Sequence, residues 1–412
     1  MKKLLLILLC LPMIGFGQGW IKGYVDAWAY SVDQTSDGGY ILAGGISTPN
    51  NHSDIWLLKT DGQGNQQWVN TFGSVEGDVC YAVQQTIDGG YILSGYIGET
   101  SNAYGEIWVS KVDSIGNPLW SNTYGSGRSI HSIEQTNDGG FVFGGTGEKI
   151  FKTDNNGNLE WAHNYDYLED IIHLTKTLDG GFIIAGLDTT MNMNPCIMKI
   201  DSLGIKQWKE IYGSNNTDWQ QISSTQEIAG GIILVGEQEF TSGPNIGYNN
   251  VWLIKINSVG DTLWERSILV DSFPFISARS IQQTSDGGFI ISGFLGNQQN
   301  EEDIILLKTD ADGVKQWVNI FGGSGMDASF SVRQTLDGGY IIAGLSESHT
   351  HTLIKTDGNG AITSTINIPI PNPNRKLQKV IDILGRETKG KKNQPLFYIY
   401  DDGTVEKRIV IE

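Results

Sequence analysis

Five aspartates occur at one recurring position of the sequence, about ten residues before a Gly-Gly pair, and these residues are the best placed to do chemistry. They are Asp26, Asp78, Asp170, Asp218 and Asp327. Carboxylates brought together could hold a cation or a hydroxyl-rich ligand, and two at a suitable separation could hydrolyse a glycosidic bond. Each could equally cap its own turn by accepting bonds from backbone N–H groups. Both interpretations stay open at this point.

Motifs for other chemistry are not found. No nucleophile, zinc or phosphate-binding fingerprint stands in a supporting context. His349 and His351 are closely spaced but have no obvious third ligand. Beyond the leader only Cys80 and Cys196 remain, so no disulfide framework is expected. We therefore expect no catalytic residue, no metal and no cofactor.

The elements that would position the five acids repeat seven times along the chain. Each copy contains the motif Thr-x-Asp-Gly-Gly-Tyr/Phe, followed by a short apolar run that ends in glycine. The motif begins its Asp-Gly-Gly part at Asp37, Asp88, Asp138, Asp179, Asp286 and Asp337, with a degenerate copy at Ala229. An Asp-Gly-Gly turn between apolar runs is typical of a β-hairpin.

A second apolar stretch in every copy ends in lysine, with glycine five residues later and usually tryptophan four residues after that. The lysines are Lys59, Lys111, Lys152, Lys199, Lys255, Lys308 and Lys355. The tryptophans are Trp68, Trp120, Trp161, Trp208, Trp264 and Trp317. We expect each tryptophan to pack between repeats, with the lysine stem covering its indole and the ammonium facing the ring.

Four short strands in roughly fifty residues describe one blade of a propeller. The sequence therefore predicts an all-β fold, a seven-bladed β-propeller with four-stranded blades over residues 19–368. The seventh tryptophan slot holds Ser364, so Trp20 could supply the missing strand and close the ring; residues 361–368 are the competing strand. An open superhelical array is the alternative architecture. In a closed ring the five acids would surround one mouth of the central channel.

The chain begins with Met1-Lys2-Lys3 and an apolar run too short to span a bilayer, which predicts a signal peptide over residues 1–18. No later segment is long and apolar enough for a transmembrane span. The formal net charge of −18 repels phosphate backbones and argues against nucleic acid as a partner.

The repeat stops after Ile368, and residues 369–374 form a proline-rich linker. Residues 375–412 then predict a small β-module, with strands at 377–384, 395–400 and 405–411 and a turn at Asp401-Asp402-Gly403. The segments Pro371-Asn372-Pro373, 380–387 and 397–408 resemble the type A C-terminal sorting domain of type IX secretion substrates from Bacteroidota. The Asp-Gly-Gly repeats also resemble propeller-like arrays that accompany such tails.

The resemblance implies export to the periplasm, passage across the outer membrane through contact of residues 375–412 with the type IX machinery, and release or attachment at the cell surface. The expected function is that of a secreted or cell-surface binding or scaffold protein, for a glycan or a partner protein. The alternative is a polysaccharide-active hydrolase or lyase that uses carboxylates at the channel mouth. A purely structural, self-associating surface protein is a third possibility.

Overall fold

A computed structural model describes residues 19–362 and parts of 376–409. The gaps in the first range are 25, 50–51, 100–104, 127–130, 145–148, 167, 191–192, 214–219, 240–248, 271–274, 297–301, 323–324 and 347–352. In the second range the described stretches are 376–381, 386–388, 395–400 and 405–409. The predicted signal peptide, the predicted linker, His349, His351 and Asp218 lie outside the described residues.

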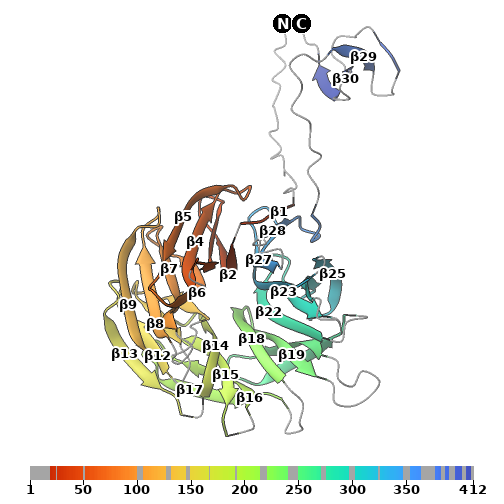
Figure 1. The fold of residues 1–412 in the computed structure, drawn as a ribbon. Helices are drawn as coiled ribbons and strands as arrows, with labels where there is room; N and C mark the ends of the chain where they lie inside the picture. Colours follow the sequence, from red (N-terminus) through yellow and green to blue (C-terminus); the bar gives the residue numbers. More distant parts are fainter. Residues whose placement is uncertain are drawn as a thin grey trace, which may run out of the picture. The chain divides into compact units, whose positions relative to one another are not determined.

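Seven four-stranded antiparallel sheets follow one another around a ring (Figure 1). Blade 1 is β2 (Ala27–Gln34), β3 (Tyr40–Ser47), β4 (Ser53–Thr60) and β5 (Gln66–Phe72). Blade 2 is β6 (Gly77–Gln85), β7 (Tyr91–Glu99), β8 (Glu106–Val112) and β9 (Pro118–Ser126). Blade 3 is β10 (Ile133–Gln135), β11 (Phe141–Gly144), β12 (Lys149–Thr153) and β13 (Leu159–Asn164). Blade 4 is β14 (Leu168–Lys176), β15 (Phe182–Asp188), β16 (Asn194–Ile200) and β17 (Lys206–Ile211).

The remaining blades complete the predicted seven. Blade 5 is β18 (Gln220–Ile228), β19 (Gly231–Glu239), β20 (Asn249–Ile256) and β21 (Thr262–Ile268). Blade 6 is β22 (Phe275–Gln283), β23 (Phe289–Gly296), β24 (Glu302–Thr309) and β25 (Lys315–Phe321). Blade 7 is β26 (Asp327–Gln334), β27 (Tyr340–Ser346) and β28 (Leu353–Thr356), joined by β1 (Trp20–Lys22) from the start of the chain. The seven-bladed, all-β prediction is confirmed.

The N-terminal strand β1 closes the ring. It pairs antiparallel with β28, with Trp20 opposite Lys355, so the predicted role of Trp20 is confirmed. Blades 7 and 1 also share hydrogen bonds, from Leu336 N to Gln34 Oε1 (2.9 Å) and from Val32 N to Ser331 Oγ (3.4 Å). These contacts exclude the open array.

The hydrophobic core is divided among the interfaces between blades. Seven clusters of buried side chains occur among the described residues, and each combines two consecutive blades. One cluster joins Ile41 and Leu57 of blade 1 to Tyr91 and Leu93 of blade 2. The apolar runs after each Asp-Gly-Gly turn supply these residues, because a strand between two neighbouring sheets is covered on both faces.

Each repeated tryptophan packs on the next blade, as predicted. Trp68 lies 5.9 Å from Tyr91, ring to ring, and a Cβ at Gly116 would approach the Trp68 ring to 2.8 Å. The equivalent Trp20 lies 6.1 Å from Tyr40 and against Gly64 in the same way. The glycine after each lysine is therefore required both for its positive φ and for room beside the indole.

The two faces of the propeller differ in regularity. The turn face, as we call it, carries the Asp-Gly-Gly turns and the hairpins between the third and fourth strands. Every described hairpin of that second kind has the same length, as at 61–65, 113–117 and 310–314. The opposite variable face carries the ends of the strands that the loops between second and third strands and the connections between blades join, and these loops and connections differ in length from blade to blade.

The C-terminal residues form a separate unit, since contacts divide the chain at Ile362 and Thr363. Its three strands are β29 (Leu377–Ile381), β30 (Pro395–Tyr400) and β31 (Val405–Ile409), paired in that order as one antiparallel sheet. The three strands agree with those predicted from the sequence. Across the described part of the chain, no helix reaches the length and apolarity needed to cross a bilayer.

Candidate functional site: the central channel

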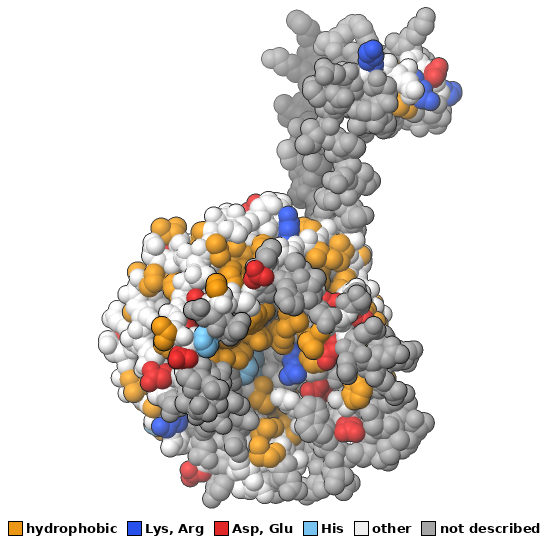
Figure 2. Space-filling model, viewed as in Figure 1, with side chains coloured by type: hydrophobic (Ala, Val, Ile, Leu, Met, Phe, Trp, Pro, Cys, Tyr) orange, Lys and Arg blue, Asp and Glu red, His pale blue; other side chains and the backbone are white. Residues whose placement is uncertain are grey.

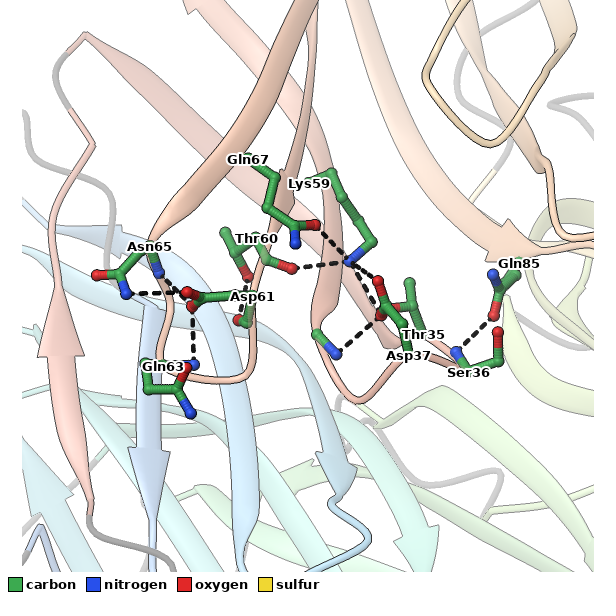
Figure 3. A network of polar contacts seen from close by, with 11 residues as sticks. Thr35, Ser36, Asp37, Lys59, Thr60, Asp61, Gln63, Asn65, Gln67 and Gln85 are labelled. Carbon is green, nitrogen blue, oxygen red and sulfur yellow. Dashed lines mark hydrogen bonds and ion pairs between the residues drawn. The ribbon is translucent and has the colours of Figure 1, made fainter.

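The repeated lysine is bound by its own Asp-Gly-Gly turn (Figure 3). In blade 1, Lys59 lies opposite Trp68, as expected, and is 3% exposed. Its Nζ, however, donates to Asp37 Oδ2 (2.9 Å), Thr60 O (2.8 Å) and Gln67 Oε1 (3.1 Å). The expectation that the ammonium faces the indole is therefore wrong, because the carboxylate offers a buried cation a stronger partner than a π-face.

The same ion pair occurs in six blades. The other five pairs are Lys111–Asp88, Lys152–Asp138, Lys199–Asp179, Lys308–Asp286 and Lys355–Asp337. Blade 5 differs because its turn holds Ala229 in place of the aspartate and is one residue shorter, with Ile228 paired to Gly231. In these six blades the Lys and Asp thus hold the hairpin to its turn and neutralise each other.

Two sets of hydrogen bonds link the innermost strands of consecutive blades. A serine hydroxyl accepts the backbone N–H of the next blade, in the pairs Val83–Ser31 (3.2 Å), Leu174–Ser132 (2.8 Å), Val332–Ser280 (3.2 Å) and Val32–Ser331 (3.4 Å). A glutamine before the turn accepts the turn N–H of the preceding blade, as from Ser36 N to Gln85 Oε1 (2.8 Å). These bonds cover the edge strands, which would otherwise expose unpaired groups.

Sequence reasoning missed the serine links, although their signal is visible as Ser-x-x-Gln-Thr before most Asp-Gly-Gly turns. Together with the Lys–Asp pairs and the tryptophan contacts, they give every repeated residue a structural role. Chemistry must therefore come from positions at which the blades differ.

One such position is a bulge in the innermost strand. The pairing of β2 with β3 shifts between Ala29 and Ser31, leaving Tyr30 as an extra residue, and the same one-residue shift occurs in blades 2, 5, 6 and 7. In blade 4 the shift leaves out residues 170–172, and in blade 3 the equivalent residue, His131, precedes β10, whose pairing has no shift. We call the residues at this position the bulge ring: Tyr30, Tyr81, His131, Ile172, Ser223, Arg279 and Phe330. A bulge turns a side chain out of the ladder, and all seven line one cavity.

This cavity is the central channel of the propeller, with a volume of about 1240 Å³. Figure 2 shows it as a hollow in the middle of the ring, with histidine and basic side chains at its wall. Its size exceeds the ~300–1,000 Å³ of ordinary small-molecule pockets. Polar groups such as Gln84, Thr175 and Gln282 line it beside the bulge ring, so the channel can contact a ligand through both apolar and hydrogen-bonding groups.

Four consecutive members of the bulge ring form an aromatic arc. The ring centroids of Phe330 and Tyr30 are 4.8 Å apart, those of Tyr30 and Tyr81 are 4.8 Å apart, and those of Tyr81 and His131 are 4.6 Å apart. The arc spans blades 7, 1, 2 and 3. Aromatic side chains offer a large apolar area at a small entropic cost, so one side of the channel presents a continuous stacking surface.

Two arginines enter the channel from blades 6 and 7. Arg279 lies 5.4 Å from the Phe294 ring, and its Nε is buried with no acceptor among the described residues. Desolvation by the surrounding protein, and then the Arg279 charge, lower the pKa of His131 in blade 3 to about 4. Burial and then the Arg333 charge lower the pKa of His173 to about 3. Both histidines are therefore neutral at pH 7.

Acidic groups in the channel are engaged by the protein. Burial raises the pKa of Glu134, and hydrogen bonding from Gln84 (3.5 Å) and the charge of Arg333 oppose the rise. Asp33 accepts the backbone N–H of Gln85 (3.3 Å). Glu237 does not line the cavity but lies near it; burial raises the pKa of Glu237, and the Arg279 charge opposes the rise.

The predicted acids do not line this cavity where the structure describes them. Asp78 is buried and accepts bonds from Ser74 N (2.5 Å), Ser74 Oγ (3.1 Å) and Gly98 N (2.7 Å), as the turn-capping interpretation expects. Asp26 is exposed, and Asp327 begins β26 opposite Ser346. Asp170 lies in β14, but its side chain is outside the described set, as is all of Asp218. A site built from the five acids stays a prediction.

Comparison with known proteins places the chain by fold. No family model matches it, and no curated protein matches it. The WD40 β-propeller domain of Doa1 is similar at a TM-score of 0.55 and 11% identity, covering 84% of this chain and 99% of that one. Streptogramin B lyase gives 0.54 and 12%, covering 83% and 99%. The Neurospora crassa Pan2 WD40 domain gives 0.54 and 10%, covering 82% and 96%. At such identities the likeness extends to the propeller fold alone.

Proposed function

We propose that this chain is an extracellular binding protein, delivered by its two terminal segments and binding its ligand in the channel of the propeller. The charged and apolar leader supports entry into the export pathway. The three-stranded unit of residues 377–409, with its sorting-domain motifs, supports passage through the type IX machinery to the medium or the cell surface.

One observation carries the binding role. Side chains that repeat in the blades are used in contacts between or within blades, whereas the bulge ring changes from blade to blade and faces a large cavity. A scaffold needs only the first set. Seven side chains of six types gathered around one cavity suit recognition of a ligand without symmetry, and the mixture of aromatic and hydrogen-bonding groups favours a glycan.

The binding role can be tested with the mature chain from residue 19 on a glycan array, with and without calcium. Saturable binding that Tyr81→Ala weakens, without a change in melting temperature, would support a glycan in the channel. A blank array under both conditions would exclude glycan recognition, and it would direct attention to a protein partner.

The delivery role has its own test. Removing residues 375–412 should leave the protein in the periplasm of its host, whereas the full chain should reach the medium or the outer surface. Export of the truncated chain at an unchanged level would contradict the proposed role of the tail.

The enzymatic alternative has less support. Similarity to streptogramin B lyase is one of fold, and of the five predicted acids Asp78 is already bound by its own connection. The hydrolase or lyase activity stays a prediction, which product analysis after incubation with polysaccharides would test.

A further inference from the structure

The aromatic and charged residues of the bulge ring are distributed unevenly around the channel, which the binding role alone does not require. Its aromatic members occupy four consecutive blades, and its one cation, Arg279, lies in blade 6, next to Phe330 of blade 7. A ligand lying on the aromatic arc would therefore meet a guanidinium at one end of the arc. The channel therefore offers an apolar surface to one part of its ligand and a cation to another.

The guanidinium of Arg279 has unused donors. Its Nε is buried, and no hydrogen bond to this side chain is found among the described residues. The Phe294 ring, 5.4 Å away, contacts the guanidinium through its π-system and does not satisfy an N–H group. Arginine presents its N–H groups as a planar fork that matches a carboxylate, and a buried donor without an acceptor is unfavourable. The Glu237 carboxyl is near enough for the Arg279 charge to oppose the rise in its pKa, but no hydrogen bond joins these two side chains among the described residues. A ligand carboxylate can therefore accept the unused N–H groups.

A second arginine strengthens the same preference. The Arg333 charge acts to lower the pKa of Glu134 in blade 3 and of His173 in blade 4, so its electrostatic effect reaches across the channel. Both channel histidines are neutral at pH 7 and add no cation. In four blades the residue just before the repeated glutamine, or before Glu227 in blade 5, accepts a backbone N–H of the next blade. These acceptors are Asp33, Gln84, Gln226 and Gln282. Arg333 stands at that position in blade 7 and can only donate.

The overall charge limits the size of the anion. At −18 the whole protein repels a long polyanion, whereas a ligand with few carboxylates enters a channel where arginines face it. The cavity of about 1240 Å³ has room for more than one ring. Hydroxyl groups of the ligand can bond the polar lining, and its C–H faces can lie on the aromatic arc.

We infer that the channel binds a short acidic oligosaccharide, with sugar rings on Phe330, Tyr30 and Tyr81 and a carboxylate on Arg279. This inference rests on the proposed binding function and specifies its ligand class. It predicts discrimination between a uronate and its uncharged ester, a property that stacking alone would not produce.

The test is calorimetric titration of the mature chain with a trigalacturonate and with its fully methyl-esterified form. The acid should bind at least about tenfold more tightly than the ester, because hydrogen bonds to charged groups exceed neutral ones. Arg279→Gln should remove this preference, and Tyr81→Ala should weaken both ligands alike. Arg266→Gln is the matched control, since Arg266 lies over Trp264 on a fourth strand and carries the same charge. It should retain the preference.

Arg279→Lys keeps the charge but loses the fork, and it serves if the glutamine variant does not fold; it should reduce the preference without abolishing it. Equal binding of acid and ester would overturn the inference while leaving a glycan-binding function in place. A preference that survives in Arg279→Gln, or that Arg266→Gln removes equally, would also overturn it. Failure of every glycan on the array would instead contradict the glycan ligand of the proposed function, and with it this inference.

Discussion

The turn face and the channel are built from the same strands, yet they differ in what repeats. On the turn face, the Asp-Gly-Gly turn, the repeated lysine and the glycine beside tryptophan recur almost without change, and each makes a structural contact within or between blades. In the channel, each blade contributes one residue beside the innermost strand pairing, in most blades at a bulge, and its type changes between most blades. Repetition in this chain marks structure, and departure from repetition marks the candidate site.

Acid should produce the largest effect, because it acts on six turns at once. Hydrogen bonds and the lysine outweigh burial and lower the pKa of Asp37, Asp88, Asp138, Asp179 and Asp286 to about 2, and that of Asp337 is also lowered, from the ordinary 3.8. A lowered folded pKa adds stability that is complete above the unfolded value and is lost below it.

We therefore expect the urea midpoint of the mature chain to be flat above about pH 5 and to fall steeply between about pH 4 and pH 2. Titration of urea unfolding against pH measures this. A chain with Asn at two of the six positions should show a shallower fall, and an unchanged slope would contradict the role assigned to the turns.

Loss of the closing strand should have the next largest effect. Trp20→Ala removes the indole that packs on Tyr40 and Gly64, and we expect it to cost about 3 kcal/mol of unfolding free energy. Ile21→Ala, at an exposed position of the same strand, is the control and should cost much less. Equal effects of the two changes in denaturant unfolding would contradict closure through Trp20.

The exception in blade 5 offers a sharper comparison. Lys308→Met leaves Asp286 without its cation and removes a buried ammonium that also donates to Thr309 O, so a loss of about 1–3 kcal/mol is expected. Lys255→Met removes the equivalent lysine in a blade whose turn has no aspartate, and it should change stability by less than about 0.5 kcal/mol. Denaturant midpoints of both variants decide whether the ion pair or the lysine stem is the stabilising element.

Loop insertions should give the smallest difference in stability among these comparisons. One glycine added within 310–314 disturbs the bonds from Asp312 N (3.0 Å) and Val314 N (2.8 Å) to Asp310, and about 1–2 kcal/mol should be lost. Two glycines added within 240–248, between β19 and β20, should cost about 0.5 kcal/mol or less, since closure entropy grows slowly with loop length. Thermal melting of both chains gives the comparison, and equal losses would remove the distinction between the faces.

Much of the frame could be predicted from the sequence, and most of the site could not. Seven copies of one motif predicted the blades, and the empty tryptophan slot at Ser364 predicted the use of Trp20. Lysine was assigned the wrong partner because strand register fixes the residue opposite Lys59 but not where a long flexible side chain ends.

The bulge ring escaped prediction for a different reason. A single extra residue such as Tyr30 or Arg279 leaves the apolar pattern on both sides unchanged, so the sequence shows an aromatic or a cation in a strand without showing that it leaves the ladder. Comparing the residue before Ser-x-x-Gln-Thr, or before the equivalent segment in the three copies that lack this motif, would have found this column.

Closure by residues 20–22 also determines the order of events when the chain folds. The first strand to be synthesised cannot bond until β28, near the other end of the propeller, is available, because Trp20 pairs with Lys355. Such a distant contact makes the complete ring a late and slow product. The proposed export requires the chain to cross a membrane. Because the ring cannot close before the last blade is present, the closed propeller cannot form while the C-terminal part of the chain is still crossing.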